Sequence, residues 1–311
     1  MNIGFGVDLG GTTVKIAVFN ETGELLSKWE IPTVTKNNGA QILPDIAASV
    51  LEYCKENGIS KESVIGLGIG VPGAVDDKGI VPSCENLGWG EVAVCEELGK
   101  LTGFPVKAGN DATVAAVGEC WKGGGQGCKN MVMVTLGTGV GGGIVIDGKP
   151  LHGTTGGAGE IGHMVLNRNE KKPCNCGKYG CVEQYCSATG IVRMATDYLA
   201  QSTEASSLQD IEKLTAKAVF DAAAAGDAVA QRVLEQVYAY MAEFIANICI
   251  VLNPEQVVIG GGVSKAGDPL LAGIRKNFPQ YVYHPNGNVE FKLAALGNDA
   301  GVYGAFKLIL E

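Results

Sequence analysis

The sequence has no excess of basic residues and no long uninterrupted apolar segment. Its 311 residues include 24 Lys and Arg against 33 Asp and Glu, which gives a formal net charge of −9. Because nucleic-acid binding requires concentrated positive surface, this balance argues against a nucleic-acid partner. The most apolar segment, Ala239 to Leu252, contains Glu243 and is shorter than the ~18–20 apolar residues of a membrane span. We therefore expect no transmembrane helix and no membrane partner.

The chain also lacks the features of secreted and of disordered proteins. Its first residues contain no basic segment followed by a long apolar one, as a secretory signal would. Several of the ten cysteines stand singly in apolar runs, which is typical of reduced intracellular thiols rather than of a disulfide framework. No linker is rich in Pro or Ser, and 46% of the residues are hydrophobic, so disorder is not expected. We expect a cytoplasmic protein.

Length and glycine content indicate two folded lobes with many turns. At 311 residues the chain exceeds the ~250–300 residues at which a single core stops growing. Glycine accounts for 46 residues, about twice the usual share of ~7%. Since no Gly-X-Y period is present, we expect these glycines at turns and at close approaches of the backbone.

One strand–turn–strand pattern occurs twice. Alternating apolar residues predict strands over residues 3–9 and 13–19, joined by a glycine turn and followed by a third short strand. Residues 131–151 repeat this pattern. The copies align at VDLGGT, which begins at Val7, and VTLGTG, which begins at Val134, an offset of 134 − 7 = 127 residues. A duplication at this spacing predicts two similar lobes, each starting with an antiparallel meander.

Each meander precedes helices and further strands. In the first copy, apolar spacing predicts a helix over residues 41–57 and a strand over 64–71. In the second copy it predicts a long helix over 227–252 and a strand over 256–259. A closing helix over 298–310 is expected to return to the first lobe. Such alternation predicts mixed-sheet α/β lobes.

The glycine turn after the first strand is a candidate phosphate-binding loop. Glycines let backbone N–H groups face one concavity, where they can bind an anion. The segment is not a Walker A loop, because GxxxxGK[ST] is absent and the turn leads into a strand. A hairpin without a ligand is the alternative, but the equivalent turn at Thr138–Gly143 favours two loops on one polyphosphate. A third run, Gly260–Gly262, could admit a flat base to the backbone.

Two acidic positions are candidates for the chemistry of phosphoryl transfer. Asp8, at the end of the first strand, could hold Mg²⁺ directly or through water, or else cap its own turn. Asn110 and Asp111 stand before a helix expected over residues 112–121, and either residue could be its N-cap. A carboxylate there could instead accept the proton of an attacking hydroxyl while Asn110 binds the same substrate. One residue can cap while the other catalyses.

A histidine and three cysteines form a candidate zinc site. His163 precedes Cys174 by eleven residues, and Cys176 and Cys181 follow in the segment CNCGKYGC. Three thiols and an imidazole are suitable ligands for a closed tetrahedral zinc site, in which no position remains for water, so the metal should be structural. The alternatives are three unrelated thiols, or Cys186 in place of His163 as the fourth ligand.

The zinc loop is expected to position groups that bind a sugar. Closing residues 174–181 against His163 would fix Glu160 and Glu183 nearby. Two carboxylates and the amide of Asn110 suit a ligand with many hydroxyl groups, because hydroxyls donate to carboxylates.

These motifs together resemble the ROK family of sugar kinases and repressors, and most closely its bacterial glucokinases. The resemblance rests on DLGGT, GND, EIGH and CNCGKYGC followed by Glu183, and extends to GNDAGVYGAF at residues 297–306. It implies an α/β fold with two actin-like, ribonuclease-H-like lobes around a cleft, which agrees with the duplication. It also implies ATP-dependent phosphorylation of the 6-hydroxyl of an aldohexose, for which we expect Mg²⁺ to accompany ATP, and a dimer or larger homo-oligomer.

The resemblance also implies roles for individual residues, with Asp111 as the general base. The implied sugar contacts are Asn110, Asp111, Glu160, His163 and Glu183. The nucleotide contacts, with Asp8 and Lys15 added from the first loop, are Gly10, Gly11, Thr12, Thr13, Thr138, Gly139 and Gly261. The implied zinc ligands are His163, Cys174, Cys176 and Cys181. We expect a smaller lobe over residues 1–115, joined by helix 297–311, and a larger lobe over 116–296 with the zinc loop at 163–181.

Other activities remain open. An N-acetylmannosamine or N-acetylglucosamine kinase, or a fructokinase, would differ in the room beside the sugar 2-hydroxyl, around Gly73 and Asn86. A catalytically silent sugar sensor would keep the fold and the zinc but would need neither the phosphate loops nor Asp111. Repressors of the family carry an N-terminal helix-turn-helix, for which a first strand beginning at residue 3 leaves no room, so an enzyme is favoured.

Overall fold

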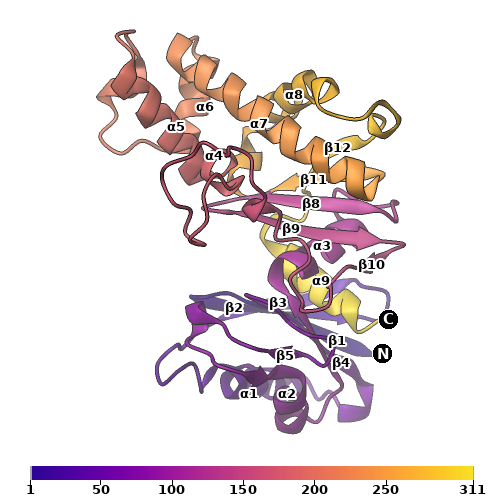
Figure 1. Ribbon diagram of the computed structural model, residues 1–311. Helices are drawn as coiled ribbons and strands as arrows, with labels where there is room; N and C mark the ends of the chain where they lie inside the picture. Colours follow the sequence, from indigo (N-terminus) through magenta and orange to yellow (C-terminus); the bar gives the residue numbers. More distant parts are fainter. Residues whose placement is uncertain (1, 311) are drawn as a thin grey trace. The chain divides into compact units, whose positions relative to one another are not determined.

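The computed structural model describes residues 2–310, which form two compact units (Figure 1). The first unit extends to Lys129 and also contains residues 143–159 and the residues from Ala295 onward. The second unit contains residues 130–142 and 160–294. The expected boundary after residue 115 would divide helix α3 (Asp111–Lys122), all of which lies in the first unit.

Packing between two helices explains why the first unit extends beyond residue 115. Val114 of α3 shares a buried cluster with Ala305 and Leu308 of α9 (Ala300–Leu308), the closing helix. The two helices therefore belong to one core, although almost the whole second unit separates them in the sequence.

The first unit is built on a five-stranded mixed sheet of order β3-β2-β1-β4-β7. The first three strands form the expected antiparallel meander, and β4 and β7 continue the sheet in parallel with β1. The sheet strands are β1 (Ile3–Leu9), β2 (Thr13–Asn20), β3 (Leu25–Pro32), β4 (Val64–Val71) and β7 (Val106–Asn110), and a separate pair is β5 (Ile80–Val81) and β6 (Val92–Ala93).

Helices cover both faces of this sheet. Large apolar residues at alternate positions of β1, such as Phe5, pack with α1 (Ile42–Glu56) and α2 (Val94–Thr102). Gly4 and Gly6 occupy two of the three intervening positions, and α9 lies so close to them that a Cβ on Gly6 would collide with the Val302 carbonyl. The alternation of large apolar residues and glycines in β1 thus determines that α1 and α2 pack on one face of the sheet and α9 packs closely on the other.

The second sheet repeats the topology of the first. Its order is β10-β9-β8-β11-β12, with β8, β11 and β12 parallel to one another and β10 antiparallel to β9. In each sheet the three meander strands lie side by side at one edge, with the last of them outermost, and the two later strands follow the first meander strand. This shared order confirms the duplication. The strands are β8 (Met131–Leu136), β9 (Val140–Ile146), β10 (Lys149–Pro150), β11 (Gln256–Gly260) and β12 (Glu290–Leu293).

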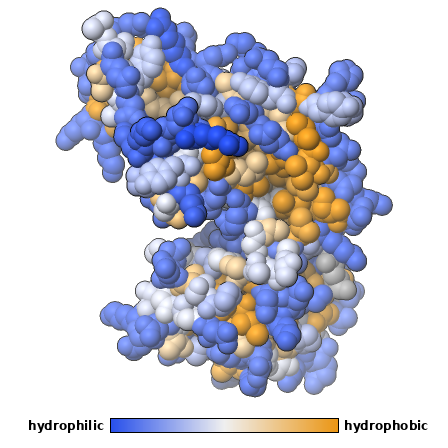
Figure 2. Space-filling view, in the orientation of Figure 1, coloured by the Kyte–Doolittle hydropathy of each residue, from blue (hydrophilic) through white to orange (hydrophobic). Residues whose placement is uncertain are grey.

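The helices of the second unit pack on its larger core. They are α4 (Glu183–Cys186), α5 (Ala188–Gln201), α6 (Ala216–Ala224), α7 (Ala228–Leu252) and α8 (Asp268–Asn277). By length and composition α7 could span a membrane, but 61% of its most apolar window is buried, as is usual for a core helix. The face drawn in Figure 2 is mostly hydrophilic, with apolar residues gathered near the end of α7. In the last turn of α7, Ile250 and Val251 are exposed.

Candidate functional site

The first glycine turn joins β1 to β2 and is held by its own backbone. The Gly10 N–H donates to the Thr13 carbonyl at 3.0 Å, and Thr33 Oγ1 donates to the Gly10 carbonyl at 2.7 Å. Gly11, Thr12 and Thr13 are exposed, and no heavy atom outside the adjoining residues lies within 4 Å of the position that a Cβ on Gly11 would occupy. The turn is therefore anchored on one side and open on the other, as a phosphate-binding loop requires.

Asp8 faces Lys15 across the β1–β2 pair. Lys15 Nζ lies 3.4 Å from Asp8 Oδ2 and donates to the Asn298 carbonyl at 3.2 Å. Burial raises the pKa of Asp8, and the charge of Lys15 opposes that rise. Among residues 2–310, the hydrogen bond recorded for the Asp8 side chain is with Lys15 rather than with the turn, so the alternative of a capping Asp8 is not supported.

Asn110 and Asp111 stand where β7 ends and α3 begins. Asn110 Oδ1 accepts a hydrogen bond from Thr113 N at 3.0 Å, and its Nδ2 donates to the Gly73 carbonyl at 2.9 Å. Asp111 Oδ1 accepts from Ala112 N at 2.8 Å and from Asn110 Nδ2 at 3.1 Å. Asn110 is therefore the N-cap, and the Asp111 carboxylate is oriented by two donors at the positive end of the helix dipole.

The same helix carries a buried carboxylate that the sequence analysis did not single out. Glu119 is 0% exposed, and its Oε2 accepts from Gly124 N at 2.7 Å and from Ala295 N at 2.9 Å. Its Oε1 accepts from Leu296 N at 2.8 Å. Three backbone donors surround one carboxylate, which thereby connects the loop after α3 to the residues that lead into α9.

The second glycine turn joins β8 to β9 and is held by the start of α5. The Gly137 N–H donates to the Gly139 carbonyl at 3.0 Å, which closes the turn. Thr189 Oγ1 donates to the Thr138 carbonyl at 2.7 Å, and Ala188 N donates to the Gly137 carbonyl at 2.8 Å. This turn, like the first, has a conformation fixed by hydrogen bonds.

A largely apolar cavity of about 370 Å³ adjoins this turn within the second unit. Phe220 and Val263 line it, together with Ala188, whose N–H holds the turn. The third glycine run borders the cavity, and Gly261 has φ of 82° with the Leu136 backbone 2.6 Å from the position of a Cβ. The cavity is large enough for a flat heterocycle beside the second glycine turn. Apart from the glycine run, its walls come from separated segments that no motif marks.

The four expected zinc ligands come together in the second unit. One donor atom from each of His163, Cys174, Cys176 and Cys181 lies within 4.8 Å of the other three. Cys176 Sγ is 3.7 Å from Cys181 Sγ, close to the ~3.8 Å edge of a tetrahedron with Zn–S bonds of ~2.3 Å. Burial raises the pKa of Cys181 to about 12, so a bound cation is needed to hold its thiolate. This donor set fits Zn²⁺, whereas Cys186 lies buried in the core and is not in the cluster.

Glu183 connects this cluster to the second glycine turn. Its Oε2 accepts from Val140 N at 3.1 Å, and a Cβ on Gly139 would collide with the same carboxylate. Its Oε1 lies 3.7 Å from Cys174 Sγ, a zinc-site thiol. Glu183 therefore contacts the metal-site loop, near which the sequence predicts it, and also the turn, a contact that the sequence did not predict.

Glu160 is connected to His163 through one short turn. Glu160 is the N-cap of a 3-10 helix (Ile161–His163) that ends at His163, and the Glu160 carbonyl accepts from His163 N at 3.1 Å. Both residues are exposed. Fixing His163 at a metal would consequently limit the positions open to Glu160.

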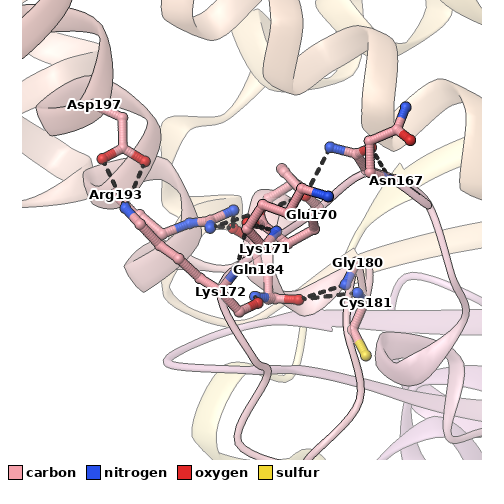
Figure 3. Close-up of polar contacts among 11 residues, drawn as sticks. Asn167, Glu170, Lys171, Lys172, Gly180, Cys181, Gln184, Arg193 and Asp197 are labelled. Atoms are coloured by element: carbon pink, nitrogen blue, oxygen red, sulfur yellow. Dashed lines mark hydrogen bonds and ion pairs between the residues drawn. The ribbon is translucent and has the colours of Figure 1, made fainter.

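A polar network fastens the zinc loop to α5 (Figure 3). Gln184 Oε1 accepts from Gly180 N at 2.9 Å and from Cys181 N at 3.1 Å, while Arg193 Nη1 lies 2.8 Å from Glu170 Oε2. Burial opposes ionisation of Glu170, but hydrogen bonds, including that from Arg193, outweigh it and lower the pKa to about 2. The loop is thus partly ordered by the protein itself.

Comparison with known proteins identifies the family. The chain matches the sequence model of the ROK family over residues 4–311. The chain belongs to the ROK family. It is 47% identical to a glucokinase of Halalkalibacterium halodurans, covering 98% of this chain and 94% of the relative. It is 37% identical to a glucokinase of Thermotoga maritima, covering 98% of this chain and 96% of the relative.

A solved structure of a ROK protein supports the same conclusion. The ROK family glucokinase from Streptomyces griseus, in complex with glucose and AMPPNP, matches with a TM-score of 0.77 and 32% identity over 99% of both chains. The expected fold class, the mixed α/β fold of ROK sugar kinases, is confirmed, and the Cys/His cluster stands as a zinc site that the residues present can form.

Proposed function

We propose that this ROK protein transfers the γ-phosphoryl group of ATP to the 6-hydroxyl of glucose. The observation that carries the proposal is the 47% identity to a glucokinase over 98% of this chain. Two anchored glycine turns, a neighbouring apolar cavity and an oriented carboxylate are groups that such a reaction needs.

We assign the nucleotide to the glycine turns. Backbone N–H groups at Gly11 to Thr13 and at Thr138 and Gly139 bind phosphate oxygens, Gly10 shapes the first turn through its own hydrogen bond to Thr13, and the cavity beside Gly261 takes the adenine. Asp8 is the carboxylate we assign to the Mg²⁺ that accompanies ATP, an ion that neutralises phosphate charge. Lys15, 3.4 Å from Asp8 Oδ2, holds that carboxylate in place.

We assign the proton transfer to Asp111. Two donors on Oδ1, Ala112 N at 2.8 Å and Asn110 Nδ2 at 3.1 Å, fix the carboxylate plane and stabilise its negative charge. The carboxylate then accepts the proton of the 6-hydroxyl as its oxygen attacks phosphorus. Asn110 keeps Asp111 oriented, and it also lies next to Gly73, near the expected room beside the sugar 2-hydroxyl.

We assign sugar recognition to Asn110, Asp111, Glu160, His163 and Glu183. Zinc bound by His163 and the three cysteines supplies a rigid centre for the loop and no reaction chemistry, because four protein ligands leave no open position. The rigid loop orients Glu160 and Glu183, whose carboxylates accept hydrogen bonds from hydroxyl groups.

A coupled ADP-release assay with zinc-loaded protein and Mg·ATP tests the proposal. Glucose, mannose, fructose, N-acetylglucosamine and N-acetylmannosamine are compared, and we expect the highest kcat/KM with glucose. Turnover only with an N-acetylated sugar or with fructose would change the assigned substrate and keep the assignment as a sugar kinase. Sugar binding by calorimetry without ADP release would instead identify a sensor.

Replacement of Asp111 by Asn tests the assigned base. The side chain keeps an Oδ1 acceptor for Ala112 N, so the helix terminus should persist while kcat falls by ~10²–10⁴. Asp210→Asn, at an exposed position, is the matched control and should turn over normally. Near-normal kcat in a folded Asp111→Asn protein would remove Asp111 from the mechanism.

A further inference from the structure

A second pair of thiols lies outside the zinc loop. Cys120 Sγ, in the last turn of α3, is 4.0 Å from Cys128 Sγ, three residues before β8. Both residues are half-buried, so small reagents can reach them. We propose that Cys120 and Cys128 form a redox-active dithiol that closes reversibly into an intramolecular disulfide.

The segment between the two cysteines allows this closure. A disulfide bond is ~2.05 Å long, so the sulfurs must approach by about 2 Å. Seven residues separate the cysteines, and four of them are glycines. Cys120 Sγ already lies 3.5 Å from the Cys128 carbonyl oxygen, and Cys128 Sγ donates to the Gly125 carbonyl at 2.9 Å. The loop backbone is thus folded onto the Cys120 thiol, and its glycines can absorb the remaining shift with little strain.

The reaction requires a small disulfide as oxidant. One thiolate of the pair attacks a sulfur of that disulfide, which forms a mixed disulfide and releases one small thiolate. The second thiolate attacks the protein sulfur of the mixed disulfide and releases the other small thiolate. The protein loses two electrons and two protons, and the oxidant is reduced to two thiols.

Closure would affect one of the segments through which the chain passes from the first unit to the second. The disulfide closes a ring of 128 − 120 + 1 = 9 residues, just before the chain passes into the second unit at Asn130. Glu119 already holds this loop at Gly124, and closure would add a second constraint by joining the two ends of the segment. Conformational steps limit turnover in many enzymes, so we expect oxidation to lower turnover; this consequence rests on the proposed function.

Peptide mapping of zinc-loaded full-length protein tests the dithiol. The protein is equilibrated with mixtures of oxidised and reduced glutathione, its zinc content is measured, and it is digested with trypsin without reduction. Cleavage after Lys122 and Lys129 separates the cysteines, so the disulfide appears as peptides 108–122 and 123–129 joined together. We expect the joined species in oxidising mixtures, about 2 Da below the summed masses, and its disappearance with dithiothreitol. Absence of the joined species from protein that retains zinc would overturn the proposal.

Serine variants separate the dithiol from other thiols. Cys120→Ser and Cys128→Ser should each lose the joined species, and Cys95→Ser, at another half-buried thiol, should keep it. Oxidised wild-type protein should turn over about twofold or more slowly, while the Cys120→Ser protein should be insensitive. A disulfide that leaves turnover unchanged would refute the regulatory consequence. Inactivity of the reduced protein would count against the proposed function, and the mapping would still decide the dithiol.

Discussion

The buried carboxylate of Glu119 allows a quantitative prediction. Glu119→Gln keeps the size of the side chain but replaces one acceptor oxygen by an NH₂ group, which cannot accept a hydrogen bond. If the amide oxygen takes the place of Oε2, Gly124 N and Ala295 N keep their acceptor. The NH₂ group then faces Leu296 N, and two donors oppose each other in a site that is 0% exposed.

The free energy of unfolding should fall by about 2–4 kcal/mol. A hydrogen bond to a charged group contributes ~1.5–3 kcal/mol, and a buried donor without an acceptor costs ~1–3 kcal/mol. Glu119→Ala should be more destabilising, since it leaves all three donors without an acceptor and opens a cavity. With a urea m-value of ~2 kcal/mol/M, Glu119→Gln should lower the unfolding midpoint by about 1–2 M.

Tryptophan fluorescence can measure this change in the unit that contains Glu119. All three tryptophans, Trp29, Trp89 and Trp121, belong to the first unit. Exposed Glu52→Gln on α1 is the matched control and should leave the midpoint unchanged. A Glu119→Gln midpoint equal to that of the control would refute the reasoning that these three backbone donors depend on the carboxylate.

Two further predictions concern the second unit. Cys176→Ala should release zinc, measured by atomic absorption, and raise the KM for sugar, because metal binding orders the loop; unchanged sugar kinetics in metal-free protein would contradict this link. For Asp227, burial opposes ionisation, but hydrogen bonds from Ala230 and from two serines lower the pKa to about 2. Its stabilising effect should therefore be complete above pH ~4 and be lost towards pH ~2. The stability difference between wild type and Asp227→Asn should shrink over that interval, and a constant difference would argue against ionisation as the cause.

The sequence predicts the topology well because strand alternation and duplication are local and repeated signals. The alternation in β1 and the 127-residue offset predicted two similar lobes that each start with a meander, and the structure has two sheets of corresponding strand order. The end of the first unit was not predicted, because it depends on α3 packing against α9. No local pattern encodes a contact between segments so far apart in the sequence.

The candidate site was predictable where its metal-binding residues are close together in the sequence. The three cysteines and His163 carry their own spacing signal, and the structure brings them together. Glu119 was missed because a glutamate in a helix usually faces solvent. The glycines at 123–125 signal the end of the helix, but no local pattern indicates that the Gly124 N–H uses the Glu119 carboxylate while the Gly123 and Gly125 N–H groups donate to the Glu119 carbonyl.

The position of Glu183 has a thermodynamic consequence. Its carboxylate bonds to Val140 N at the glycine turn and lies 3.7 Å from Cys174 Sγ at the metal site. Two ligands that each depend on the placement of one side chain have linked affinities, and linkage is reciprocal. If bound zinc changes nucleotide affinity by some factor, bound nucleotide changes zinc affinity by the same factor. If zinc raises nucleotide affinity by fixing Glu183 at the turn, the protein holds its metal most tightly while nucleotide is bound, and a chelator removes it most readily from the nucleotide-free form.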